Sequence, residues 1–211
     1  MIALGNKRHI FWRKTIMANY VYSYTTVRNA NEEAMKIFRD FAILLNAHDH
    51  SADAIAELYG EEVVDTAGWM IDRVGAKWLT VEDASEEGLS LTSAWSPPET
   101  LLDKLHEKML AVDPNVEIYM TYEDEMPNFM GYKAWKGDDC DEEYFDDSTY
   151  KYIYEDWKTT EQIEEACTVD GELDEEQEME MAQDQYYELQ DAWHDKAYEW
   201  IEDYYNYEDE E

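Results

Sequence analysis

The stretch SPPETLLDKLHEKMLAVDPNVEIYMTY, residues 96–122, carries the signals of a helix followed by a strand. Ser96 stands three residues before Glu99, and Pro97 would occupy the first helical position, which is typical of a capping box. Apolar residues then recur at helical spacing: Leu101, Leu105 and Met109. The run VEIYMTY, residues 116–122, alternates and is rich in β-branched and aromatic residues, which favours a strand.

The segments on either side of this stretch extend the pattern. We expect strands at residues 19–27 and 128–135, a hairpin formed by residues 76–85 and 89–96, a helix over residues 31–47 and a short helical piece near residues 52–58. The order β-α-β-β-α-β is that of the split ferredoxin-like motif. The sequence therefore predicts an α+β fold, with a four-stranded antiparallel sheet and two helices on one face.

Two motifs within this region resemble the YubB-type ferredoxin-like domain family of bacteriophage and plasmid proteins, over roughly residues 18–137. The resemblance is carried by Trp95, Ser96, Pro97 and Pro98, by Tyr122, Asp124, Glu125, Phe129 and Gly131, and by Gly75, Lys77 and Trp78. Met126 and Pro127 stand where the family usually has Gly after Asp-Glu. The resemblance implies a ferredoxin-like fold and a phage or plasmid origin, hence the cytoplasm of an infected bacterium. It implies no particular activity.

Charge divides the chain into three parts. The whole chain has 52 acidic and 16 basic residues, a net charge of −36. Residues 1–16 carry +4, residues 17–137 carry −13 and residues 138–211 carry −27. We therefore expect a basic leader outside the folded part over residues 1–16, with Met17 as an alternative start. The ferredoxin-like domain would follow over residues 17–137, with an acidic, mainly helical region over residues 138–211.

This composition excludes several classes of function. A strongly acidic protein repels nucleic acid and anionic membrane and attracts basic protein surfaces. No stretch approaches the roughly 18 apolar residues of a membrane span. Cys140 and Cys167 are too few for a disulfide framework, which favours a reduced, cytoplasmic protein.

No group of residues predicts catalysis or a metal site. Asp124 and Glu125 are the best acidic pair, but neighbouring strand residues point to opposite faces. His48 and His50 supply two ligands where zinc needs three or four. A calcium loop starting at Asp139 would need Gly and Glu where Tyr144 and Tyr150 stand. The prediction is a protein that is not an enzyme and has no cofactor.

The last part of the chain carries the strongest functional signal. The apolar residues form a helical stripe: Met179, Ala182, Tyr186, Leu189, Trp193, Ala197, Trp200 and Tyr204. This predicts one long amphipathic helix, after a shorter helix near residues 159–167 and an aromatic strand or turn near residues 149–157. From Asp174 to Glu211 the net charge is −15. At about 1.5 Å per helical residue this is about one charge per 3.8 Å, close to the 3.4 Å of a DNA strand.

Two main hypotheses follow. In the first, a phage-type inhibitor binds a basic nucleic-acid-binding protein of the host or its defence system by imitating phosphates. The predicted partner-binding residues are Asp184, Glu188, Asp191, Asp195, Glu199 and Glu202, with Trp193 and Trp200. In the second, the aromatic stripe is the interface of an assembly module, for example a homodimer. A third hypothesis is an enzyme that uses Asp124 and Glu125 with a metal.

Overall fold

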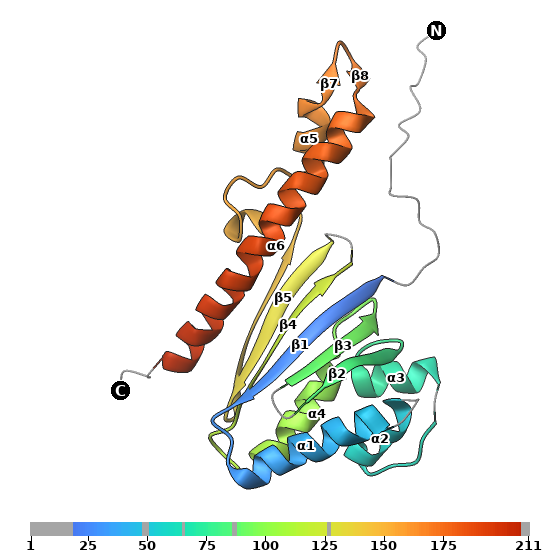
Figure 1. Ribbon diagram of the computed structural model, residues 1–211, viewed down its shortest axis with the longest axis vertical. Coiled ribbons are helices and arrows are strands. Elements are labelled where there is room, and N and C mark those ends of the chain that lie inside the picture. Colours follow the sequence, from blue (N-terminus) through green and yellow to red (C-terminus); the bar gives the residue numbers. More distant parts are fainter. Residues whose placement is uncertain (1–18, 48–50, 65, 86–87, 126–127, 208–211) are drawn as a thin grey trace.

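The computed structural model describes residues 19–47, 51–64, 66–85, 88–125 and 128–207 (Figure 1). The strands are β1 (Tyr20–Arg28), β2 (Leu79–Ala84), β3 (Gly88–Ala94), β4 (Glu117–Asp124), β5 (Phe129–Lys136), β6 (Asp139–Asp146), β7 (Thr168–Val169) and β8 (Glu172–Leu173). The helices are α1 (Glu32–Ala47), α2 (Ser51–Tyr59), α3 (Ala67–Val74), α4 (Glu99–Leu110), α5 (Thr160–Ala166) and α6 (Glu175–Asn206), with a 3-10 turn at Tyr150–Tyr152.

Six strands form one antiparallel sheet in the order β2-β3-β1-β4-β5-β6, and β7 and β8 form a separate small hairpin. The predicted α+β class is confirmed, and each predicted strand is present. β6 was not predicted. It pairs with β5 from Lys136↔Asp139 to Phe129↔Asp146, so the sheet continues across the boundary expected near residue 137. Gly137 permits this tight turn because its φ is +58°.

Helices α1 to α4 cover one face of the sheet, which we call the first face (Figure 1). Phe38, Phe41 and Leu45 line the buried side of α1, at the helical spacing read from the sequence. The buried side of α4 is lined by Leu101, Leu105 and Met109, as predicted, together with Leu102 and His106. The strands contribute Val21, Leu91, Ile118 and Met120 to this core.

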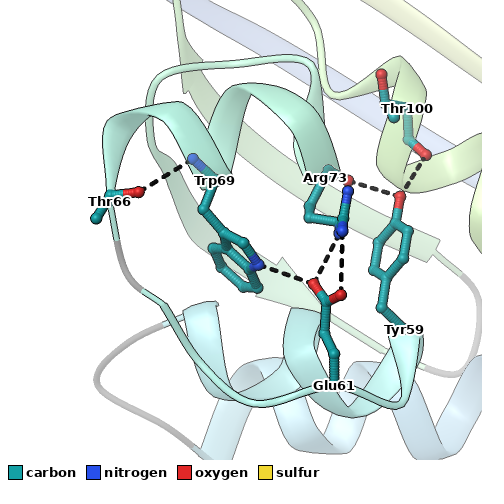
Figure 2. A network of polar contacts seen from close by, with 6 residues as sticks. All are labelled: Tyr59, Glu61, Thr66, Trp69, Arg73 and Thr100. Atoms are coloured by element: carbon teal, nitrogen blue, oxygen red, sulfur yellow. Dashed lines mark hydrogen bonds and ion pairs between the residues drawn. The ribbon is translucent and has the colours of Figure 1, made fainter.

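A polar network connects α2 and α3 on the first face (Figure 2). The Glu61 carboxylate accepts hydrogen bonds from Trp69 Nε1 at 2.8 Å and from Arg73 Nε and Nη2 at 2.7 and 3.1 Å. The Arg73 guanidinium also lies 5.1 Å from the centre of the Tyr59 ring. One arginine is therefore held between a carboxylate and an aromatic ring.

Helix α6 covers part of the opposite, second face. Its buried residues are Leu189, Trp193, Ala197, Ile201 and Tyr205, and they pack on Tyr119, Met130, Tyr132, Ala134, Phe145, Tyr150 and Ile153. Burial of each large apolar side chain contributes about 1.5–3 kcal/mol. The acidic helix is thus fixed to the sheet by a second core and is not a solvated tail.

Two details of the predicted helices were wrong. Pro98, not Ser96, is the N-cap of α4 and it makes no side-chain capping bond. Ser96 instead donates its hydroxyl to the Gly75 carbonyl at 2.6 Å, tying the helix start to the end of α3, which was not predicted. On α6, Met179 is 54% exposed, because the first turns of the helix extend past the sheet (Figure 1).

Candidate partner-binding surface

The acidic residues predicted on the last helix form one row along α6. Asp184, Glu188, Asp191, Asp195, Glu199 and Glu202 are spaced by three or four residues, and we call them the acidic ridge. At about 100° per residue the first five lie on the side of the helix opposite the buried residues, whereas Glu202 lies toward the sheet, where Arg28 binds it. The first five are exposed and Glu202 is partly exposed. The ridge spans about 27 Å, over which one strand of B-DNA presents about eight phosphates.

Most of the ridge has no basic partner within the described part of the chain. Lys196 donates to Glu199 at 2.9 Å, and Arg28 holds Glu202 through both guanidinium nitrogens, with Nη2 to Oε2 at 3.3 Å. Among the described residues, no Lys, Arg or His pairs with the four remaining carboxylates, those of Asp184, Glu188, Asp191 and Asp195. These four carboxylates are therefore the part of the ridge open to an incoming cation.

Of the two tryptophans predicted to contact a partner, Trp193 is buried and Trp200 is half-buried against the sheet. Trp193 is 1% exposed and packs edge-to-face on Phe145, with ring centres 5.9 Å apart. Trp200 is half-buried and stacks on Phe145 at 5.3 Å and on Tyr132 at 6.2 Å. The apolar face of α6 is thus occupied by the chain's own sheet. We correct the prediction accordingly, because neither the second core nor Trp193 is available to a partner while α6 is docked.

Asp124 and Glu125, the acidic pair considered for catalysis, lie in different surroundings, as expected for neighbouring residues at a strand. Asp124 is 1% exposed, and its carboxylate accepts hydrogen bonds from the Asn128 backbone at 3.1 Å, from Asn128 Nδ2 at 2.6 Å and from Asn19 Nδ2 at 3.3 Å. Burial raises the pKa of Asp124, and the hydrogen bonds from Asn128 and Asn19 oppose the shift. Glu125 is half-buried and accepts a bond from the Tyr20 N–H. Asp124 therefore links the end of β4 to Asn128, just before β5, and to Asn19, just before β1.

Metal binding and membrane insertion have no support in the described ranges. No three His, Cys, Asp or Glu side chains gather there as a metal site, and His48 and His50 lie outside those ranges. The segment considered for calcium is strand β6. Among the helices described, none is both long and apolar enough to cross a bilayer.

One exposed aromatic surface was not predicted from the sequence. Tyr20, Tyr22 and Tyr24 alternate along β1 with the buried Val21, Ser23 and Thr25, and project from the second face. Their exposed fractions are 38%, 47% and 44%, and we call them the tyrosine face. The strict alternation in YVYSYT contains the signal, but hydrophobicity alone would turn the large tyrosines inward and the small polar residues outward.

Comparison with known proteins adds no relatives. No protein-family model matches the chain, and neither a curated protein nor a solved structure matches it. The function is therefore argued from this chain's own surface.

Proposed function

We propose that this protein is a non-enzymatic inhibitor or modulator that binds a basic nucleic-acid-binding protein through the acidic ridge of α6. The observation that carries the proposal is the docked helix, whose buried stripe fixes it to the sheet and holds the ridge outward. A rigid row of carboxylates can match a row of Lys and Arg side chains that otherwise contact phosphates. This chemistry favours a basic partner, and the resemblance to phage and plasmid proteins points to a protein of a bacterial host or of its defence system, in the cytoplasm.

We further propose that residues 20–124 have the ferredoxin-like arrangement. The order β2-β3-β1-β4, with every neighbouring pair antiparallel, supports it. On this view β5, β6 and α6 are additions that extend the sheet and cover part of its second face.

Substitution tests the ridge better than truncation does. Ending the chain at residue 137 would remove β6 and α6 and expose Met130, Tyr132 and Ala134, which are at most 3% exposed in the intact protein. A ridge variant should instead carry D184N, E188Q, D191N, D195N and E199Q.

The matched control neutralises five exposed acids on the helical side of the protein: E33Q, E57Q, E62Q, D72N and E107Q. Both variants have the same net charge. We expect the wild-type and control proteins to retain a basic nucleic-acid-binding protein from a bacterial lysate, to release it at moderate salt and to compete with nucleic acid for it. The ridge variant should not retain it. Equal retention by the two variants, or retention insensitive to salt, would refute the proposal.

The alternative function, an assembly module, can still be tested as self-association through an exposed surface. Because the aromatic stripe is covered by the sheet, self-association would have to use an exposed surface. A sedimentation experiment that gives a dimer with unchanged affinity in the ridge variant would favour this alternative.

A further inference from the structure

The second face of the sheet is only partly covered by α6. The helix packs on residues of β4, β5 and β6. Strand β1 lies in the middle of the sheet (Figure 1), and its exposed side presents the tyrosine face. At the border, the Tyr119 hydroxyl meets the Tyr198 hydroxyl of α6 at 3.4 Å. Among the described residues, no side chain stacks on Tyr22 or Tyr24. Two half-exposed rings therefore remain available beside the acidic helix.

Carboxylates lie on the side of this face nearest Tyr20 and Tyr22. Glu123 stands opposite Tyr22 in the β1–β4 ladder and accepts a hydrogen bond from Gln190 of α6 at 3.3 Å. Glu125 lies beside Tyr20, where it accepts the backbone N–H at 3.3 Å. The pKa of Tyr22 is raised by partial burial and, next, by the charges of Glu125 and Glu82. The face is thus aromatic and negative, which disfavours a phosphate backbone and favours a cation.

The chain's own arginines show how a guanidinium binds such a surface. Arg28, at the end of the same strand, is bound by the Glu202 carboxylate and lies 5.2 Å from the centre of the Tyr205 ring. Arg73 is bound by Glu61 and lies 5.1 Å from Tyr59 (Figure 2). In both places a guanidinium sits between a carboxylate and a tyrosine. The tyrosine face again places carboxylates beside tyrosine rings, but no arginine among the described residues stacks on Tyr22 or Tyr24.

We propose that the tyrosine face binds arginine side chains of an extended, arginine-rich segment of the partner protein. The inference rests on the proposed function in one respect, that the partner is basic. It adds a second contact surface and a chemical preference. The ridge would supply long-range attraction, and the rings of Tyr22 and Tyr24, flanked by Glu123 and Glu125, would select guanidinium groups.

The preference for arginine follows from shape. A guanidinium is planar, stacks on an aromatic ring and still directs a fork of N–H donors at a carboxylate. A lysine ammonium can also lie between a ring and a carboxylate, as Lys104 does 5.8 Å from the Tyr59 ring and 2.7 Å from Glu107, but it is compact and strongly hydrated and does not stack as a plane. Ridge carboxylates in water distinguish the two cations poorly, so discrimination should come from the tyrosine face.

The test is isothermal titration of the full chain with oligo-arginine and oligo-lysine peptides of equal length at moderate salt. We expect the wild-type protein to bind oligo-arginine more tightly. Y22L/Y24L should weaken oligo-arginine binding by about 5- to 30-fold, as expected for two cation–π contacts, and should barely change oligo-lysine binding. Y22F/Y24F keeps the rings and should stay within about twofold of wild type. Matched controls are Y152L and Y207L, which alter tyrosines that are 63% and 70% exposed elsewhere.

The ridge variant separates this inference from the proposed function. It should weaken binding of both peptides while leaving the arginine-to-lysine ratio intact. If no basic partner is ever captured but the ratio depends on Tyr22 and Tyr24, the proposed function fails and the arginine site stands. Equal affinity for the two peptides, or an unchanged ratio in Y22L/Y24L, overturns the inference. Two other results would also overturn the inference, because each assigns the tyrosine face to a different occupant. If the protein is a dimer that Y22L/Y24L dissociates, the occupant is a second copy of the chain. If oligo-arginine binds only after deletion of residues 1–16, the occupant is that segment.

Discussion

Alanine at Gly131 should strongly destabilise the protein, whereas alanine at Gly68 should stabilise it. A Cβ on Gly131 would lie 2.4 Å from the Glu143 carbonyl oxygen, 2.4 Å from the Tyr122 hydroxyl and 2.6 Å from Tyr122 Cζ. The first of these is backbone paired in the β5–β6 ladder, and the Tyr122 ring is 5% exposed. The carbonyl cannot move without disturbing the β5–β6 pairing, and the ring cannot move without disturbing the core. The free energy of unfolding should therefore fall by about 3 kcal/mol, the upper part of the 1–3 kcal/mol typical of overpacking.

Gly68 is the matched control because the same methyl group meets no atom within 4 Å there. Gly68 lies in the first turn of α3. Alanine there should raise the free energy of unfolding by about 0.5–1 kcal/mol, because it lowers the conformational entropy of the unfolded chain. Urea unfolding followed by circular dichroism should therefore separate G131A and G68A by about 3–4 kcal/mol. If G131A unfolds at the wild-type urea concentration, the close approach of β6 and Tyr122 to Gly131 is not present in solution.

Three further outcomes follow from the packing. W193A should lower the free energy of unfolding by about 3–5 kcal/mol and Y152A, altering an exposed ring, by less than about 0.5 kcal/mol; equal effects would contradict the docking of α6. Burial lowers the pKa of His106 from its ordinary 6.5, so the folded state binds fewer protons and stability should fall as pH drops below about 6.5; H106Q should flatten this slope in urea titrations, and an unchanged slope would exclude His106 as its source. A double-mutant cycle of R28M and E202Q should give a coupling of about 0.5–1 kcal/mol that shrinks in high salt, since both side chains are partly exposed, and a coupling of zero at low salt would remove Arg28 as an anchor of α6.

Local periodicity predicted most of the elements. Alternation identified β1, and helical spacing identified α1, α4 and the long α6, because their buried faces repeat at one period. The exact buried stripe was less predictable. The buried residues from Leu189 to Tyr205 recur every four residues, which at about 100° per residue turns the buried face around the helix by about 40° per step. By the last turns Ile201 and Tyr205 are therefore more deeply buried than the expected Trp200 and Tyr204.

Long-range pairing explains what periodicity missed. The β6 sequence DCDEEYFD has low strand propensity, and Phe145 is its single buried residue, so only its pairing with β5 makes it a strand. Its charges also protect a free sheet edge from further pairing. The ridge positions could be predicted because they lie on the side of the helix away from the apolar stripe. The ion pair between Glu202 and Arg28, 174 residues earlier, could not be predicted from local sequence.

The late position of α6 in the chain has a consequence for biosynthesis. The part of the acceptor surface that the sheet provides is complete once β6 ends at Asp146, yet about 60 residues remain before α6 ends at Asn206. At about 5–20 residues per second, translation leaves Met130, Tyr132 and Phe145 uncovered for about 3–12 s, and longer while the last turns remain within the ribosome. A nascent chain in that interval presents an apolar sheet to chaperones and to its neighbours on the polysome. Slowing synthesis within the α6 codons should therefore lower the yield of soluble protein without changing a single residue.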